Sequence, residues 1–199
     1  TETADAPPFA LSDMPFLYDD LSVYENKVIY YESSRGCPFK CAYCMSAGTA
    51  PTFAPLDKVR RDLEYFLGHN VRQVKFVDRT FNYPADRMNE ILMALLALSE
   101  KYPQSKTRFH FEISASLLRE ETIALLLQAR PGLIQLEIGI QSTHPETLRA
   151  VRRTHDTEKL LHNTRLLCNA GSLHVHVDLI AGLPYESYEI FKQSFDDAY

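Results

Sequence analysis

Apolar positions recur along the chain with two different periods from residue 26 onward. Short runs of β-branched and aromatic residues predict strands, and longer segments with an apolar stripe at every third or fourth residue predict amphipathic helices. The predicted strands cover residues 27–32, 73–78, 108–113, 133–139 and 174–180. The predicted helices cover residues 56–69, 86–101, 120–128, 156–170 and 186–199. Strand and helix therefore alternate along the whole of this region.

This alternation, with short links, is typical of βαβ units, in which parallel strands form a sheet that helices cover. The period alone fits either an open doubly wound sheet or a barrel-type sheet. Residues 1–25 come before the alternation, are polar, and contain Pro7, Pro8 and Pro15. We interpret residues 1–25 as an extended arm or interdomain linker that packs onto the core, and residues 26–199 as the core itself.

Composition narrows the class of protein. The 199 residues are enough for one domain with a sizeable core. A net charge of −5 offers no basic surface, so nucleic acid is not an expected partner. No apolar run is long enough to span a membrane, so no membrane partner is expected either. Four cysteines without a secretory leader indicate a reducing, cytoplasmic setting.

Three of the four cysteines, Cys37, Cys41 and Cys44, lie close together in a CxxxCxxC run, and Cys168 is far along the chain. Three thiolates in one loop can ligate three irons of a [4Fe–4S] cluster. With no fourth cysteine nearby, one iron would stay open to a substrate or cofactor. The alternatives are a non-catalytic iron–sulfur electron carrier or sensor, a zinc-binding structural module, although zinc prefers four ligands in CxxC pairs, and three unrelated thiols.

Polar residues stand where the predicted strands end. In parallel α/β folds these ends meet at one edge of the sheet, where ligands bind. A carboxylate in an apolar strand equally fits an ion pair with a structural arginine, so one such residue does not define a site. The polar groups at this edge are the cysteine loop, residues 78–82, Glu112 with Ser114, Glu137 with Gln141, and Asp178.

The cysteine run resembles the CxxxCxΦC signature of the radical S-adenosylmethionine (SAM) superfamily, with Tyr43 at the aromatic position Φ. In that family the open iron binds the amino nitrogen and carboxylate of SAM, and one electron cleaves SAM to methionine and a 5′-deoxyadenosyl radical. The resemblance implies an enzyme with a (β/α)6 partial TIM-like barrel, so we expect a sixth strand and helix outside this chain. It also implies an external electron donor such as flavodoxin or ferredoxin.

Residues 138–142, Arg153 and residues 177–184 resemble the coproporphyrinogen-dehydrogenase-like branch of that superfamily. By this resemblance, Gln141 and Asp178 would hold the ribose hydroxyls of SAM.

The same resemblance assigns the two ends of SAM. Glu112 and Arg153 would hold the methionine end. Backbone at Tyr43 and near Ile180 and Ala181 would border the adenine. Where many members carry a Gly-Gly-Glu-like run whose backbone holds the SAM amine, this chain has residues 77–82, so a backbone carbonyl or Asp78 would contact that amine.

Residues 30–37, 76–82 and 178–186 resemble a bacterial radical SAM group that has an N-terminal cobalamin-binding domain. The resemblance runs from about residue 26 to the end. It implies cobalamin, bound through a domain outside this chain, with methyl transfer or a cobalamin-assisted rearrangement as the outcome. The substrate, a small molecule or another unidentified partner, is not predicted. The residues expected to select it belong to the carboxyl-terminal segment expected outside this chain and include side chains such as Asp78, Arg79, Asn82 and Glu137.

Overall fold

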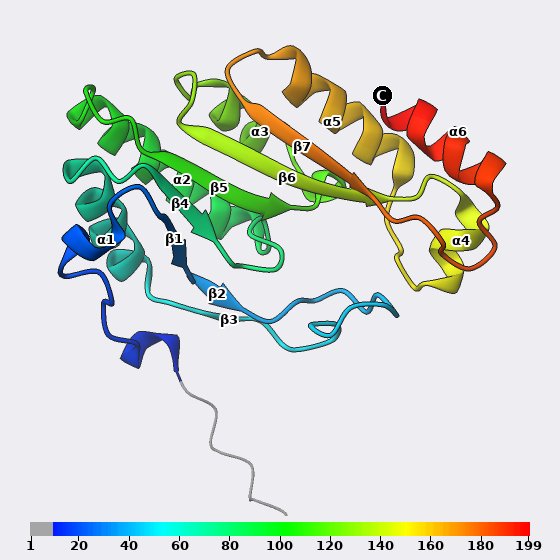
Figure 1. Ribbon diagram of the computed structural model, residues 1–199, viewed down its shortest axis with the longest axis horizontal. Helices are drawn as coiled ribbons and strands as arrows, with labels where there is room; N and C mark the ends of the chain where they lie inside the picture. The colour runs from blue at the N-terminus through cyan, green and yellow to red at the C-terminus, as the bar shows by residue number, and fades with distance from the viewer. Residues whose placement is uncertain (1–9) are drawn as a thin grey trace, which may run out of the picture.

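The computed structural model describes residues 10–199, and in this part of the chain one sheet of parallel strands forms the centre. Its spatial order is β1-β4-β5-β6-β7, which follows the order along the chain (Figure 1). A doubly wound sheet reverses its strand order at a switch point, whereas a barrel-type sheet does not. The sequential order therefore identifies a partial barrel. The strands are β1 (Val28–Tyr31), β4 (Gln73–Phe76), β5 (Arg108–Ile113), β6 (Ile134–Gln141) and β7 (His174–Leu179).

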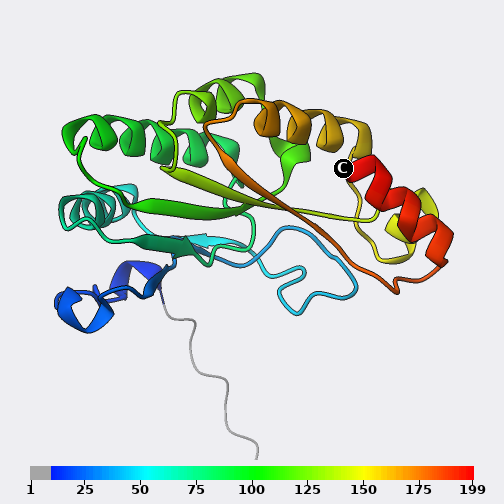
Figure 2. The same ribbon diagram turned by 45° about the horizontal axis from the view of Figure 1, so that its top comes forward.

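Helices follow the strands and lie along one face of the curved sheet, while the opposite face stays open (Figures 1 and 2). Each predicted strand and helix is present, with ends within two residues of the predicted ends. Among residues 10–199, none of the helices combines the length and the apolar character required to cross a membrane. The helices are α1 (Leu56–Gly68), α2 (Ala85–Lys101), α3 (Glu120–Leu127), α5 (Thr157–Asn169) and α6 (Tyr188–Ala198).

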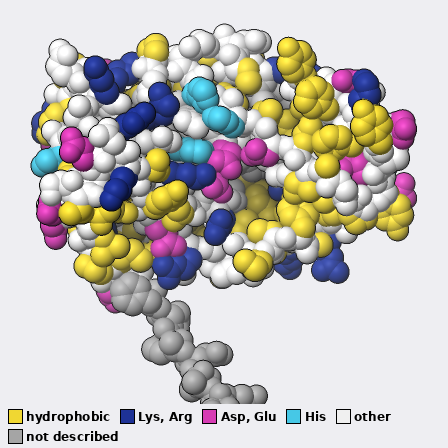
Figure 3. Space-filling view, viewed as in Figure 1, with side chains coloured by type: hydrophobic (Ala, Val, Ile, Leu, Met, Phe, Trp, Pro, Cys, Tyr) yellow, Lys and Arg dark blue, Asp and Glu magenta, His cyan; other side chains and the backbone are white. Residues whose placement is uncertain are grey.

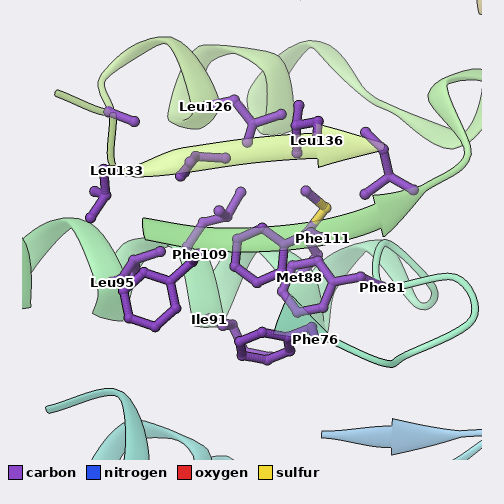
Figure 4. Packing of buried hydrophobic residues seen from close by; sticks show 14 of the residues in the cluster. Phe76, Phe81, Met88, Ile91, Leu95, Phe109, Phe111, Leu126, Leu133 and Leu136 are labelled. Carbon is purple, nitrogen blue, oxygen red and sulfur yellow. The ribbon is translucent and has the colours of Figure 1, made fainter. Parts of the chain in front are cut away.

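The hydrophobic core lies between the sheet and these helices. Strand side chains alternate between the two faces, so every second residue of β5 points toward the helices. Phe109 and Phe111 are fully buried there, and Phe111 packs against Phe76 with ring centroids 4.7 Å apart. Figure 4 shows these rings against Met88 and Ile91 of α2. Burial of these large side chains is the main source of stability for this face.

The open face of the same sheet is polar. Lys75 of β4 pairs in register with His110 of β5, and Glu112 of β5 pairs with Glu137 of β6, which in turn pairs with His176 of β7. The interior of a closed TIM barrel is filled by layers of packed side chains, most of them bulky and branched. The polar inner face here is suited to contact water or a ligand.

The described part of the N-terminal arm, residues 10–25, contacts helix α1. It contains two short 3₁₀ helices, η1 (Leu11–Asp13) and η2 (Leu21–Tyr24). Phe16 packs edge-on against Tyr65 of α1, with ring centroids 4.9 Å apart. The remainder of the predicted arm, residues 1–9 with Pro7 and Pro8, lies outside the described residues. The boundary between arm and core at residues 25 and 26 stays a prediction.

The sequence pattern did not predict three short elements. Strands β2 (Ser34–Arg35) and β3 (Thr52–Phe53) form an antiparallel pair, and helix α4 (Pro145–Ala150) lies between β6 and α5. Two-residue strands and a six-residue helix are too short to show a period. The signal for α4 was local: Pro145 stands at its first position, where a missing N–H is tolerated.

Candidate functional site

The cysteine loop is closed at its base by backbone contacts. Strands β2 and β3 pair at its two ends, and the Cys37 amide donates to Thr49 O at 2.9 Å. Gly36 has φ +100°, and a Cβ at this position would lie 2.7 Å from Ala50 O. Only glycine therefore lets the two ends of the loop approach each other this closely.

All three cysteines of the loop line one cavity, which lies at the carboxyl ends of the strands. Cys37 and Cys41 are buried, and Cys44 is exposed. The Cys37 sulfur lies 3.4 Å from Thr80 Oγ1, and the Cys41 sulfur accepts a hydrogen bond from Arg153 Nη1 at 3.7 Å. The cysteines therefore face a common space from different sides.

Within residues 10–199, no group of three or more His, Cys, Asp or Glu side chains converges on a point where it would hold a single metal ion. A structural zinc ion would need four ligands around one point. An iron–sulfur cluster has a different requirement, because each thiolate binds a separate iron and the thiolates lie around the cluster. Three cysteines spread around a cavity fit that second donor set.

The structure brings most of the predicted site residues to this cavity. Figure 3 shows acidic, basic and histidine side chains gathered beside a hollow on the open face. The sequence did not single out Phe39, Ile113 or Gly139, which also line it. The residues expected at this edge that line the cavity are Cys37, Cys41, Cys44, Tyr43, Arg79, Thr80, Glu112, Ser114, Glu137, Gln141, Arg153 and Asp178.

Gln141 reaches the cavity through an irregular end of strand β6. The pairing of β6 with β7 shifts between Gly139 and Gln141, and Gln141 has the left-handed φ of +71°. A Cβ on Gly139 would collide with Gln141 Nε2, so the glycine leaves room for this side chain. Gln141 Oε1 is buried without a hydrogen-bond partner. A strained residue with an unsatisfied buried acceptor is typical of a ligand site.

Arg153 comes from the turn after α4. Its amide donates to Leu148 O at 2.9 Å, and the preceding Arg152 has φ +54°. The guanidinium donates through Nη2 to Gly139 O and through Nη1 to Tyr43 Oη at 3.4 Å. Its Nε is buried without a partner. Helix α4, which the sequence did not predict, therefore sets the position of a predicted site residue.

These unsatisfied atoms test whether the site fits the expected cofactors. A buried polar group without a partner carries a free-energy penalty that a ligand can remove. Gln141 Oε1 needs a donor, such as a hydroxyl, and Arg153 Nε needs an acceptor, such as a carboxylate. SAM carries both kinds of group, and both atoms belong to side chains that line the same cavity as the cysteines. The residues present therefore fit SAM beside a cluster.

A cluster of charged groups adjoins the cavity on the inner face. Lys75 Nζ lies 3.1 Å from Glu137 Oε2 and 3.6 Å from Glu112 Oε1. Burial, and then the charge of Glu137, raise the pKa of Glu112 and of Asp178. Glu137 also lies 2.9 Å from His110 Nε2, a contact by distance without hydrogen-bond geometry, and burial lowers the pKa of His110.

Asp78 requires a correction. It is 1% exposed and does not line the cavity. Its carboxylate accepts hydrogen bonds from Ser33 N at 2.9 Å, Ser33 Oγ at 2.6 Å and Ser34 Oγ at 2.5 Å. Burial raises its pKa, and these hydrogen bonds oppose that rise. Asp78 therefore holds the chain before the cysteine loop, and it is placed as a structural residue rather than as the predicted contact for the SAM amine.

Asn82 is corrected in the same way. Its amide group exchanges two hydrogen bonds with the backbone of Ser114, at 2.7 and 2.9 Å, and it is 2% exposed. It therefore fixes the end of β5 and does not line the cavity. Arg79 and Glu137, the other two residues expected to select the substrate, do line the cavity.

Tyr43 and Ile180, the residues expected near the adenine, differ in position. Tyr43 lines the cavity, and burial raises the pKa of its phenol to about 12. The Ile180 side chain is not among the lining residues, and its amide already donates to Gln141 O at 3.0 Å. Only the Ile180 carbonyl is left for an adenine contact, and both adenine contacts stay predictions.

Comparison with known proteins finds the same family that the cysteine motif resembles. Residues 31–198 match the family described as the radical SAM superfamily. The oxygen-independent coproporphyrinogen-III oxidase-like protein HemZ of Bacillus subtilis is 24% identical over 195 residues, covering 89% of this chain and 38% of HemZ. The cobalamin-dependent radical SAM methyltransferase TokK of Streptomyces tokunonensis is 26% identical over 167 residues, covering 81% of this chain and 24% of TokK.

The fold also matches a solved structure. The radical SAM methyltransferase TsrM from Kitasatospora setae, with cobalamin and a [4Fe–4S] cluster bound, superposes with a TM-score of 0.72 at 18% identity. The match covers 85% of this chain and 34% of TsrM, so it shows a shared fold. The chain spans between 24% and 38% of the length of HemZ and TokK. With its partial barrel, its cysteine loop and a family match over residues 31–198, the chain belongs to the radical SAM superfamily.

Proposed function

We propose that this chain is a catalytic core that binds a [4Fe–4S] cluster through Cys37, Cys41 and Cys44 and binds SAM beside it. The observation that carries the proposal is one cavity shared by the three cysteines, Gln141 and Arg153, with buried polar atoms there that lack partners. When bound and reduced by one electron, the cluster supplies reductive cleavage of SAM to methionine and a 5′-deoxyadenosyl radical.

The residues of the chain bind and orient SAM. Arg153 has five N–H donors, and its unpartnered Nε suits the methionine carboxylate. Glu112, which lines the same cavity, carries the charge that suits the amino group of the same end. Gln141 Oε1 and the Asp178 carboxylate are acceptors for the ribose hydroxyls. Apolar Phe39 and Ile113 line the same cavity and keep water from part of it.

The substrate binds, in this proposal, where the cavity continues onto the polar inner face of the sheet. Glu137 lines the cavity and faces Lys75 and His110 on the neighbouring strands. These groups, with Arg79, provide both charges for recognition of a polar substrate. An external reductant, a flavodoxin or a ferredoxin, delivers the electron.

The comparisons favour a second, finer proposal. TokK is named as cobalamin-dependent, and the TsrM structure holds cobalamin together with a [4Fe–4S] cluster. We propose that this core works with cobalamin held by a domain outside these 199 residues, and that it transfers a methyl group. Purification of the complete gene product in the presence of hydroxocobalamin tests this. Co-purification of cobalamin near one equivalent is expected, and a full-length protein that binds none contradicts it.

Anaerobic reconstitution with iron and sulfide, followed by dithionite and SAM, tests the main proposal. We expect brown protein that releases 5′-deoxyadenosine and methionine in equal amounts. Cys41→Ala should lose cluster and products, whereas Cys168→Ala, which changes an exposed cysteine away from the cavity, should retain both. A stable cluster with no SAM binding would favour the electron carrier, and colourless protein with one tightly held zinc would favour the zinc module.

A further inference from the structure

The Arg153 guanidinium contacts the cysteine loop as well as the sheet. Through Nη1 it donates to the Cys41 sulfur at 3.7 Å and to Tyr43 Oη at 3.4 Å. Through Nη2 it donates to Gly139 O on strand β6. Cys41 is 6% exposed, so little water competes for its sulfur. A positive side chain therefore lies against one of the three sulfurs proposed to hold the cluster.

Backbone contacts hold this arginine and the cysteine loop together. The Ala42 amide, next to Cys41, donates to Val151 O at 2.8 Å. Two residues after Val151, the Arg153 amide donates to Leu148 O at 2.9 Å. Backbone hydrogen bonds therefore fix the chain beside both Arg153 and Cys41. A long side chain on an open surface would have no such support.

Other cations near the cavity have different partners. Lys75 lies between Glu137 and Glu112. Arg79 lines the cavity, and its positive charge acts on Glu112, where it opposes the rise in the pKa of that carboxyl. Across residues 10–199, Arg153 is the cationic side chain that donates a hydrogen bond to a cysteine.

Hydrogen bonds to the sulfurs and local charge set the reduction potential of iron–sulfur clusters. A donor that carries positive charge stabilises the reduced cluster more than the oxidised cluster, because reduction adds negative charge that spreads onto the sulfurs. The potential then rises, and a weaker reductant suffices to deliver the electron.

We propose that Arg153 is a positioning residue that raises the reduction potential of the cluster by donating a hydrogen bond to the Cys41 sulfur. This inference rests on the proposed function, since it requires the cluster. It goes beyond the SAM contact, because it gives Arg153 a role in the protein without SAM. One guanidinium then serves both the electron step and the binding step.

A potentiometric titration followed by electron paramagnetic resonance, on the reconstituted protein without SAM, tests the proposal. Arg153→Gln removes the positive charge and the N–H donors of the guanidinium. At the potential that half-reduces the wild type, we expect its ratio of reduced to oxidised cluster to fall about tenfold, which is a shift of ~59 mV for one electron. Arg153→Lys keeps the charge and should recover part of the shift.

Arg149→Gln is the matched control, because it removes the same charge from an exposed position on α4. Its potential should equal that of the wild type. Equal potentials for the wild type and Arg153→Gln would overturn the proposal while leaving the cluster and the proposed function intact. Absence of a cluster in the wild type would instead overturn both.

If Arg153→Gln takes up no cluster, the reduction potentials of Arg153→Lys and Tyr43→Phe test the proposal instead. Tyr43→Phe removes one anchor of the guanidinium without changing charge or sulfur. A lowered potential in either variant supports the proposal, with the smaller shift expected for Tyr43→Phe. Wild-type potentials in both overturn it.

Discussion

The two faces of the parallel sheet use the same strands for different purposes. On the helix side, Phe109 and Phe111 of β5 are fully buried among apolar residues. On the open side, His110 and Glu112 of the same strand face Glu137 and Lys75. One residue along the strand therefore separates a stabilising position from a position available to a ligand. Substitutions on the two faces should separate stability from binding.

The largest expected effect is on the helix side. Phe111→Ala leaves a cavity in the packing between the sheet and α2, and we expect a loss of about 3–5 kcal/mol in the free energy of unfolding. Glu112→Gln, the next residue on the open side, should change it by less than about 1 kcal/mol. Urea denaturation of the protein without cluster measures both. Similar losses from the two variants would contradict the division between the faces.

A smaller loss of stability is expected from Asp78, the carboxylate buried near the open side. Asp78→Ala leaves the donors of Ser33 and Ser34 without their acceptor, which should destabilise the protein by about 1–3 kcal/mol. Asp78→Asn retains an oxygen and should cost less. If Asp78 instead bound the SAM amine, Asp78→Asn would weaken SAM binding to the reconstituted protein and leave the unfolding midpoint unchanged.

Gly139 should show the reverse behaviour. A Cβ there would collide with Gln141 Nε2 but lie only in ordinary contact, at 3.4 Å, with Arg153 Nη2, so Gly139→Ala displaces Gln141, which is proposed to bind SAM. We expect about tenfold weaker SAM binding, which is ~1.4 kcal/mol, with little change in the unfolding midpoint.

Gly68→Ala is its control, because the added Cβ makes ordinary contacts with Tyr102 at 3.5 Å and beyond. Equilibrium binding of SAM to the reconstituted proteins compares the two variants. Equal affinities for Gly139→Ala and Gly68→Ala would contradict the proposed contact between Gln141 and SAM.

The smallest expected effect is the pH dependence from His110. Burial lowers its pKa from the ordinary value of 6.5, so the unfolded chain binds the proton more readily than the folded chain. The stability contributed by neutral His110 is present above pH 6.5 and is lost as the pH falls through 6.5 toward the lowered pKa. Between pH 7.5 and 5.5, the wild type should therefore lose up to about 1 kcal/mol more than His110→Gln.

Glu112 and Asp178 have raised pKa values and act in the opposite direction, because folding favours their protonated forms. The difference between the wild type and His110→Gln is consequently more informative than either pH curve alone. Denaturation curves at matched ionic strength provide it. A larger loss in His110→Gln than in the wild type would reverse the assigned direction.

Periodicity predicted the long elements well, because each strand and helix buries one side against the other layer. Strand β5 was predicted with both ends correct, since Phe109 and Phe111 alternate with polar residues. Helix α4 and the β2–β3 pair were not predicted, because a six-residue helix and two-residue strands are too short to show a period.

The sequence predicted which residues line the candidate site better than it predicted their contacts. Gln141, Arg153 and Asp178 do line the cavity with the cysteines. Asp78 looked the same in the sequence, as a polar residue after a strand, yet Ser33 and Ser34 bind it beneath the loop. The sequence also contained no sign that Arg153 touches the Cys41 sulfur, which depends on α4 and on the Ala42 contact.

The central claim is that SAM binds the open iron of a cluster held by Cys37, Cys41 and Cys44. Electron paramagnetic resonance of the reconstituted, reduced protein with and without SAM tests it most directly. The account predicts a [4Fe–4S]⁺ signal whose shape changes when SAM is added. A cluster signal that stays the same at saturating SAM would contradict it.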